Sequence, residues 1–406
     1  MKKTLAAVAV LGAFAGTALA ADVTLYGKID AGLNYTHVSK DGSASTDDFS
    51  MKSGQNSGSR FGLKGTEQIA DGLTVGFQLE SGFESDDGSL KYGKGDNDRI
   101  FGREARLYVQ TNFGEFGFGR MGGLDSGAGS YDLIADASPF GTGWGGATAQ
   151  MDNYFMGLTS RYDNMITYKS PEFAGLTVVA QASLKEATDA DGDEGSHLAD
   201  RYYAIGLGAD YGALTGALTF SMQDYGGMTA DHKTGFGNTI KDHDWNDKDG
   251  YAVTAFGAYD FGVTKVSLGA QYFDNVAQSR GSTTFEYAFD DENKTFGAKY
   301  GDTSVGVTGY GVILGAITPI AGGSLYTAIG YADYEASKLD TDDKGAKKFD
   351  GQNYGIGIGY QYPLSKRTYV YTAASWNRAT ENDGGVNDKD VDTDTTEVMA
   401  GIVHNF

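Results

Sequence analysis

The sequence contains no cysteine and only 4 prolines among 406 residues. The absence of cysteine excludes disulfide bonds, thiolate metal sites and a cysteine nucleophile. A long uninterrupted apolar run is also missing after residue 20, so no later segment could cross a membrane as a helix. The net charge of −22 argues against nucleic acid as a partner, because a phosphate backbone is bound by a clustered basic surface.

The first 20 residues have the pattern of a secretory signal peptide. Two lysines precede an uncharged run at residues 5–15, and residues 18–20 (ALA) place small side chains where a signal peptidase reads them. A membrane anchor would need roughly 20 apolar residues, and this run is shorter and ends in a cleavage site. We therefore expect residues 1–20 to be removed and residues 21–406 to form a single domain.

Glycine and aromatic residues are abundant, with 61 glycines, 26 tyrosines and 22 phenylalanines. This much glycine lowers helix propensity, whereas tyrosine, valine and threonine favour strands. Residues 60–83 show the pattern that recurs along the chain, in which apolar side chains such as Phe61, Leu63, Val75 and Phe77 alternate with polar ones. A period of two predicts strands with one apolar and one polar face.

Sixteen segments of this kind occur, and their connections alternate between short turns and long polar loops. An even number of strands of about 10 residues, with short turns at one end and long loops at the other, is typical of a transmembrane β-barrel. A large soluble β-sandwich would explain the alternation, but not the regular change between short and long connections. The expected strands lie near residues 23–36, 58–69, 73–85, 102–112, 115–122, 159–169, 175–186, 201–211, 214–224, 251–260, 263–274, 303–317, 324–335, 352–362, 367–377 and 396–406.

Strand parity predicts which side chains face lipid and which face the lumen. In the first strand, the odd positions from Val23 to Leu33 should face lipid, and Lys28 and Asp30 should face the lumen. A Lys or Arg on the lipid face costs roughly 2–4 kcal/mol near the midplane, so charged side chains in the middle of a strand should point inward. Sixteen strands enclose an interior too wide for side chains to fill, which predicts an aqueous channel. The other lumen positions by this rule are Arg60, Lys64, Glu80, Glu104, Arg106 and Tyr108.

The longest connection, residues 123–158, is the candidate for narrowing this channel. Its tract at residues 138–146 is apolar and rich in glycine, and would be poorly placed in open water. A long loop in a compact architecture is usually functional. We expect the loop to fold into the barrel with its apolar side against the wall and with Asp132 and Asp136 toward the opening. An ordinary surface loop is the alternative.

A set of short motifs occurs in order along the mature chain: residues 25–28 (LYGK), 60–69 (RFGLKGTEQI), 118–120 (FGR), 130–132 (SYD) and the terminal Phe406. As a set they resemble the general diffusion porins of Gram-negative outer membranes, and most closely the neisserial and β-proteobacterial branch. The resemblance implies a homotrimeric, sixteen-stranded barrel through which ions and small hydrophilic solutes diffuse. It also implies contact with outer-membrane lipid and lipopolysaccharide, and a terminal aromatic residue that resembles the signal read by the barrel assembly machinery.

The resemblance further implies a constriction in which loop carboxylates face a basic cluster on the wall. Lys28, Arg60, Arg120 and Arg161 match the basic positions of the family. Simple alternation would turn Arg120 toward lipid, so we expect a bulge at Gly119. For the other lumen charges, Lys64 and Arg106, a role in the constriction and a role in stabilising the wall are equal alternatives.

The acidic side of the constriction departs from the enterobacterial pattern. The Pro-Glu-Phe tripeptide of the enterobacterial loop is found here only at residues 171–173, in a short turn. Asp132 and Asp136 are therefore the preferred loop carboxylates, and Asp125 is a third candidate.

Two other functions stay open, a substrate-specific channel and an outer-membrane hydrolase. A sugar channel would be expected to carry an aromatic track, whereas the predicted lumen wall is ionic. A hydrolase needs a positioned nucleophile or base, but the five histidines show no recognisable ligand spacing. We expect no enzymatic activity and no cofactor.

Divalent cations are a further prediction for the acidic loops, where they would bind loosely and bridge to lipopolysaccharide phosphates. The acidic run at residues 189–194 could bind Ca²⁺, but it lacks the full spacing of a calcium loop. A solvated acidic loop is the favoured interpretation of that run.

Overall fold

The computed structural model describes residues 23–91, 99–157, 161–184, 201–224, 249–276, 307–336, 350–382 and 390–406. Four short strands are described by their backbone alone: β12 (His232–Lys233), β13 (Thr239–Ile240), β16 (Glu286–Asp290) and β17 (Thr295–Lys299). The predicted signal peptide and the acidic run at residues 189–194 lie outside the described residues. No helix in the described stretches is long and apolar enough to cross a membrane.

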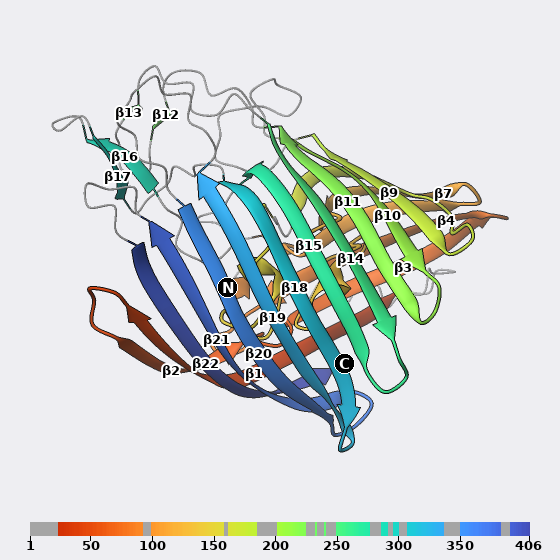
Figure 1. Cartoon of the computed structure of the whole chain (residues 1–406). Helices are drawn as coiled ribbons and strands as arrows, with labels where there is room; N and C mark the ends of the chain where they lie inside the picture. Colours follow the sequence, from red (N-terminus) through yellow and green to blue (C-terminus); the bar gives the residue numbers. More distant parts are fainter. Residues whose placement is uncertain are drawn as a thin grey trace, which may run out of the picture.

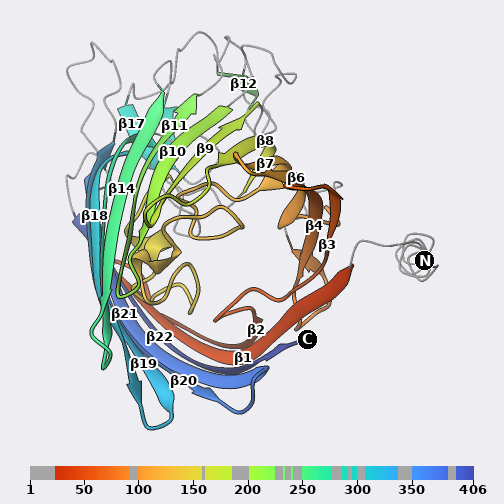
Figure 2. The same cartoon turned by 90° about the vertical axis from the view of Figure 1, so that its right-hand side faces the viewer.

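The wall is a single antiparallel sheet in which all sixteen predicted strand segments are found. Neighbours in the sequence pair in turn around the wall, and β22 pairs with β1, so the sheet closes into a barrel (Figures 1 and 2). Closure leaves the ring of strands without an edge, as a sheet surrounded by lipid requires. The wall strands are β1 (Thr24–Lys40), β3 (Arg60–Ala70), β4 (Leu73–Phe83), β6 (Glu104–Thr111), β7 (Gly114–Met121), β8 (Tyr162–Lys169), β9 (Leu176–Ser183), β10 (Arg201–Asp210), β11 (Leu214–Asp224), β14 (Gly250–Asp260), β15 (Lys265–Val276), β18 (Val307–Ile320), β19 (Gly323–Ala336), β20 (Asp350–Pro363), β21 (Thr368–Asn382) and β22 (Asp390–Asn405).

The last residue of the chain completes the closure. The amide of Phe406 donates to the carbonyl of Gly27 at 3.0 Å, and the amide of Gly27 donates to the carbonyl of Phe406 at 3.1 Å. The Phe406 ring covers Gly27, where an added Cβ would lie 2.2 Å from a ring carbon. Glycine is therefore the residue that allows the terminal ring to lie against the first strand.

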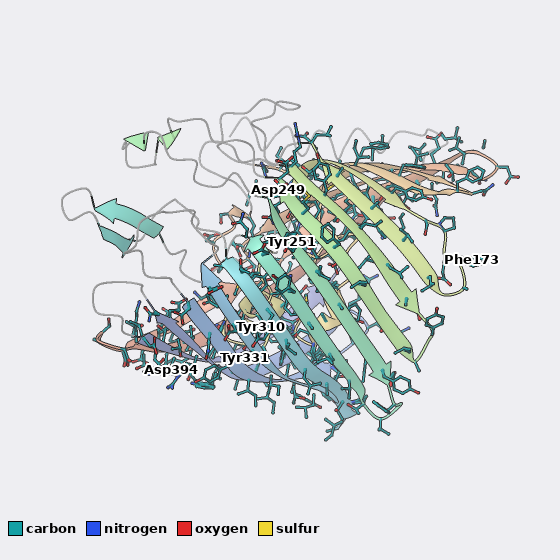
Figure 3. The ribbon with its side chains drawn as sticks, turned by 45° about the horizontal axis from the view of Figure 1, so that its top comes forward. Phe173, Asp249, Tyr251, Tyr310, Tyr331 and Asp394 are labelled. Carbon is teal, nitrogen blue, oxygen red and sulfur yellow. The ribbon has the colours of Figure 1, made fainter. Side chains whose placement is uncertain are left out.

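The two faces of the wall follow the predicted parity. On β1, Leu25, Ile29 and Leu33 are exposed on the outer face, whereas Asp30 and Asn34 are buried on the inner side. Tyr251, Tyr310 and Tyr331 stand on the outer face, and Asp249 and Asp394 lie toward the same end of the barrel, opposite the turn that carries Phe173 (Figure 3). Aromatic side chains in this position are typical of a barrel where the membrane meets water.

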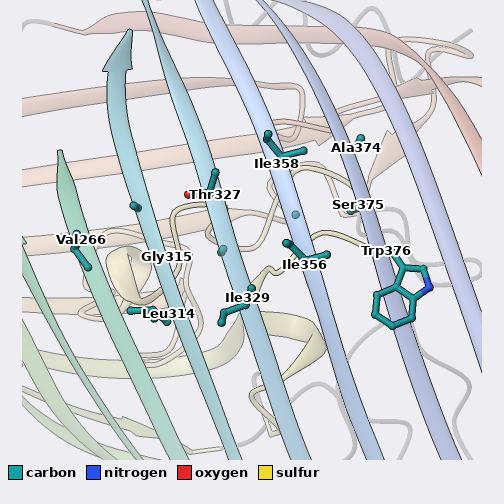
Figure 4. A pocket seen from close by; sticks show the side chains of 13 residues that line it. Val266, Leu314, Gly315, Thr327, Ile329, Ile356, Ile358, Ala374, Ser375 and Trp376 are labelled. Atoms are coloured by element: carbon teal, nitrogen blue, oxygen red, sulfur yellow. The ribbon is translucent and has the colours of Figure 1, made fainter. Parts of the chain in front are cut away.

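The outer face also carries an apolar hollow of about 620 Å³ that crosses β15, β18, β19, β20 and β21 (Figure 4). Its side chains include Leu314, Ile329, Ile356, Ile358 and Trp376. Each of these five strands is paired with a strand on both sides. The backbone at the floor of this hollow is therefore satisfied within the sheet.

Two strands outside the sixteen join the same sheet. β2 (Thr46–Ser53) pairs with β1 from Ala31 to Val38, and β5 (Leu90–Lys91) pairs with the end of β4. β2 was not among the predicted strands, because its residues, TDDFSMKS, contain only two large apolar side chains.

Candidate functional site

The connection between β7 and β8 folds into the lumen, where it contains the short 3-10 helices η1 (Ala135–Ala137) and η2 (Met151–Asn153) (Figure 2). Its apolar tract packs on the inner wall: Trp144 lies 4.9 Å from Tyr326 and 5.6 Å from Tyr371, measured between ring centroids. Phe140 meets the Trp144 ring edge-on at 5.6 Å and is 2 % exposed. The apolar tract therefore faces the wall, as the sequence predicted.

Glycines on the inner face of the wall make room for this loop. A Cβ added at Gly330 would lie 2.1 Å from the ring of Tyr154, and one at Gly311 would lie 1.8 Å from the carbonyl oxygen of Tyr154. Both distances are far below van der Waals contact, so a side chain at either position would displace the loop. The large number of glycines thus has a local role in addition to its effect on helix propensity.

Polar contacts tie the loop to the wall at two separate points. Ser130 donates through its amide (2.7 Å) and its hydroxyl (2.6 Å) to the two carboxylate oxygens of Glu104 on β6. The amide of Ala147 donates to Glu397 on β22 at 3.0 Å. Because the loop crosses from β6 to β22, we expect the opening that remains to lie between the loop and the inner side of β1 and β3.

Basic side chains gather on that uncovered part of the wall. Arg103 donates to Glu80 at 2.5 Å, and Arg60 lies 3.8 Å from the same carboxylate oxygen. Lys28 and Arg60 both donate to the hydroxyl of Ser57, at 3.1 and 3.0 Å. Lys28 and Arg60 are thus brought together, and Arg103 joins them.

A second basic group lies beside the first. Asp163 on β8 pairs with Arg120 at 2.5 Å and with Arg99 at 2.9 Å. Arg161 is buried and donates through Nε to the carbonyl of Arg103 at 2.6 Å. Together with Lys28, Arg60 and Arg103 these residues form the basic row, which comprises Lys28, Arg60, Arg99, Arg103, Arg120 and Arg161.

The predicted bulge at Gly119 is confirmed. The pairing of β7 with β8 shifts register between Gly119 and Met121, and Gly119 has a φ of 121°. A Cβ at Gly119 would lie 2.2 Å from the carbonyl oxygen of Ala105, so only glycine fits this conformation. The bulge turns Arg120 inward to Asp163.

The other two predicted basic residues lie apart from the basic row. Arg106 on β6 is held between the rings of Tyr108 and Tyr131, 4.6 and 4.9 Å from their centroids, and donates to Glu115 at 3.2 Å. Lys64 is exposed and lies 5.3 Å from the centroid of the Tyr26 ring. The packing of Arg106 between two rings and a carboxylate is the geometry of a side chain that ties the loop to the wall.

The three loop carboxylates occupy different positions. Asp125 is 3 % exposed and accepts hydrogen bonds from Tyr202 on β10 and Ser221 on β11. Asp136 is exposed and pairs with Lys265 on β15 at 2.6 Å. Their contacts place Asp125 between the loop and the wall, and Asp136 beside β15.

Asp132 organises the loop itself. It accepts hydrogen bonds from the amides of Gly127 (2.8 Å) and Ala135 (2.7 Å). Burial raises the pKa of Asp132 to about 7, although these amide hydrogen bonds oppose the rise. This carboxyl group therefore changes its charge close to neutral pH.

Sequence reasoning missed Arg103 and Arg99. Arg103 has the opposite parity to Glu104 and Arg106, so strand alternation would have turned it outward; it lies just before β6 begins and is free of that alternation. Its donation to Glu80 could be anticipated only from the fold.

Among the residues that the structure describes, no group of three or more His, Cys, Asp or Glu side chains could hold a metal ion.

Comparison with known sequences agrees with this architecture. The family model described as "Gram-negative porin" matches residues 6–384. An outer membrane porin protein of Bordetella pertussis is 33% identical over an alignment of 427 residues that covers 100% of both chains. Outer membrane porin protein 32 of Delftia acidovorans is 29% identical, with 91% of this chain and 88% of that protein covered.

Solved structures share the fold. An anion-selective porin from Comamonas acidovorans has a TM-score of 0.63 at 23% identity and covers 95% of this chain and 100% of its own. OmpT of Vibrio cholerae, solved in a trimer form, has a TM-score of 0.56 at 16% identity and covers 95% of this chain and 100% of its own. With the family match over most of its length and a full-length relative at 33% identity, the chain belongs to the Gram-negative porin family.

Proposed function

We propose that this outer-membrane porin passes ions and small hydrophilic solutes by diffusion through an opening whose basic row favours anions. One observation carries the proposal: the two wall carboxylates beside the basic row each pair with two arginines. Glu80 pairs with Arg60 and Arg103, and Asp163 pairs with Arg99 and Arg120. Each of these groups has one more positive than negative charge. Lys28 lies beside the first group, with Asp30 close to it.

The opposite balance occurs around Arg106, which contacts both Glu104 and Glu115. Glu104 is 2 % exposed, and its oxygens already accept the hydrogen bonds of Ser130. This acidic group is therefore covered by the loop, whereas Lys28 and Arg60 lie on the wall that the loop leaves uncovered. The charge that ions meet at the opening is positive on this account, which supports a preference for anions.

The reversal potential of purified protein in a planar bilayer tests the proposal. With KCl at different concentrations on the two sides, a channel that favours anions reverses toward the chloride equilibrium potential. A reversal toward the potassium potential would show that the acidic loops govern selectivity and that the basic row does not. A barrel that selects one solute, the alternative function, would show conductance blocked by that solute at low concentration.

Partners and activity follow as further parts of the proposal. The chain assembles as a homotrimer, as the solved trimer form of OmpT supports, and Phe406 serves as its signal for the barrel assembly machinery. It lies in outer-membrane lipid and lipopolysaccharide. It has no hydrolase activity, and esterase and protease assays on the folded protein check this.

Loosely bound divalent cations at the acidic loops bridge to lipopolysaccharide phosphates. EDTA treatment that left the association with lipid unchanged would contradict this part of the proposal.

A further inference from the structure

The connection between β2 and β3 lies beside the basic row. We call its residues 54–59 the support segment. The buried carboxylate of Asp30 accepts hydrogen bonds from the amides of Asn56 at 2.8 Å and Ser57 at 2.9 Å. The hydroxyl of Tyr371 donates to the other oxygen of the same carboxylate at 2.8 Å. These contacts fix the backbone of Ser57 against β1.

The side chain of Ser57 holds two cations at one oxygen. Lys28 donates to this hydroxyl at 3.1 Å, and Arg60 donates to it at 3.0 Å. A hydroxyl oxygen has two lone pairs, so it can accept both hydrogen bonds. The two side chains carry like charges that repel each other, and the shared hydroxyl offsets part of that repulsion.

Each of the two cations also has a carboxylate nearby that it does not bind closely. Arg60 lies 3.8 Å from Glu80, which is longer than a hydrogen bond. Asp30 is close enough to Lys28 to attract it, but Lys28 forms no ion pair with any carboxylate in the described part of the chain. The oxygens of Asp30 are occupied instead by the three uncharged donors named above.

We propose that Ser57 is a positioning residue for the passage of anions. Its hydroxyl keeps Lys28 and Arg60 at the opening and apart from the neighbouring carboxylates. Without it, Lys28 would turn to Asp30, and Arg60 would close on Glu80. A cation in a close ion pair presents less positive charge to a passing ion than one bonded to a neutral hydroxyl. This inference rests on the proposed preference for anions and names the uncharged residue that maintains it.

The variant Ser57→Ala tests the proposal directly, because it removes the hydroxyl and changes no charge. In a KCl gradient across a planar bilayer, its reversal potential should move toward the potassium potential by a shift comparable with that of Lys28→Ala. Ser57→Thr keeps a hydroxyl and should reverse at the wild-type value. A reversal potential of Ser57→Ala that equals the wild-type value would overturn the proposal.

Ser50→Ala is the matched control on the neighbouring strand β2. The hydroxyl of Ser50 donates to Asp48 at 2.7 Å, so the same substitution there leaves the contacts of the basic row in place. Its reversal potential should equal that of the wild type. A shift as large as that of Ser57→Ala would contradict a specific role for Ser57.

A combined variant distinguishes positioning from a general structural effect. If Ser57 acts through the two cations, Ser57→Ala should add no shift to the reversal potential of Lys28→Ala/Arg60→Ala. A further shift in that background would refute action through these cations. Circular dichroism of the purified proteins checks that each variant keeps the barrel.

Tyr371→Phe provides a second measurement that leaves Ser57 intact. The variant keeps the ring that lies 5.6 Å from Trp144, but it frees one oxygen of Asp30 to accept from Lys28. Its reversal potential should also move toward the potassium potential. The absence of a shift would contradict the competition between Asp30 and Ser57 for Lys28, on which the proposal depends.

The wild-type recording separates this inference from the proposed function. A wild-type channel that reverses toward chloride, together with an unshifted Ser57→Ala, would refute the role of Ser57 and leave the preference for anions standing. A wild-type channel that reverses toward potassium would refute both.

Discussion

Arg60 and Arg103 share the carboxylate of Glu80, so removing one arginine leaves a neutral pair in place of a positive group. Arg60→Ala should therefore shift the reversal potential toward that of the cation, by lowering the positive charge at the opening. Lys28→Ala should shift it in the same direction, because Lys28 donates to the same Ser57 hydroxyl as Arg60.

Arg378 offers a matched control for these variants. It faces outward on β21 and pairs with Asp394 at 2.7 Å, so ions in the lumen do not meet it. Arg378→Ala should leave the reversal potential at the wild-type value. An equal shift in Arg378→Ala and Arg60→Ala would mean that overall charge, and not the basic row, sets the preference.

Asp132 predicts a dependence on pH near neutrality. Its pKa of about 7 exceeds the ordinary 3.8, so the folded protein holds this proton at pH values where the unfolded chain has lost it. The contribution of Asp132 to the free energy of unfolding is therefore unchanged below 3.8, falls as the pH rises from 3.8 to about 7, and is level above that. Asp132→Asn should remove this step from thermal unfolding measured between pH 4 and 8. If the variant kept the step, another group would be responsible.

At the residue scale, the sequence predicted single positions best where one rule applied. Parity placed Arg60 and Arg106 on the inner side, and the clash between parity and motif at Arg120 correctly indicated a bulge. Asp125, Asp132 and Asp136 share one loop and one residue type, but their partners come from β10 and β11, from the loop's own amides and from β15. Nothing local in the sequence distinguishes these three environments, because each partner is distant along the chain or set by the loop's fold.

At the scale of elements, the position of the loop depends on the inner side of β18 and β19, where glycines leave room for Tyr154. Gly330→Leu should push Tyr154 away from β19 and move the loop toward the basic row, at a cost of roughly 1–3 kcal/mol for overpacking. Single-channel conductance should fall, because the loop then takes space from the opening. A thermal unfolding scan should show the loss of stability.

Gly257→Leu is the control for this change. A Cβ at Gly257 has no atom within 4 Å, so the same substitution on β14 meets open space. Its conductance should equal that of the wild type. Unchanged conductance in Gly330→Leu would show that the loop does not border the opening.

The loop itself was predictable, since its apolar tract had to be covered by something within the fold. The wall that covers it was not, because inward glycines such as Gly311 and Gly330 look like any other glycine in a strand. β2 was missed for a related reason: it has few apolar side chains, and its strand conformation comes from pairing with β1.

At the scale of the whole molecule, closure of the barrel depends on a contact between its two ends. Phe406→Ala keeps the backbone hydrogen bonds to Gly27 but removes the ring that covers it. We expect a lower yield of folded barrel in the outer membrane, measured by the mobility difference between heated and unheated samples on denaturing gels. His404→Ala, two residues earlier on the outer face, should give the wild-type yield.

The number of strands and the closed topology followed from the sequence, because alternation and connection length repeat sixteen times and each repeat supports the others. The strand ends were less certain: β22 begins at Asp390, whereas the sequence indicated residue 396. The residues added at this end, DVDTDT, are polar except for Val391, and they stay in the sheet because all of them pair with β21 and residues 393–395 also pair with β1.

Polymer exclusion measures the central feature directly, which is a water-filled barrel narrowed by an inner loop. Single-channel conductance of the purified protein is recorded with neutral polymers of increasing size in the bath. A water-filled barrel narrowed by the loop should give discrete conductance steps that small polymers lower and that polymers wider than the opening leave unchanged. Folded protein that produced no steps, or steps that were insensitive even to the smallest polymer, would contradict it.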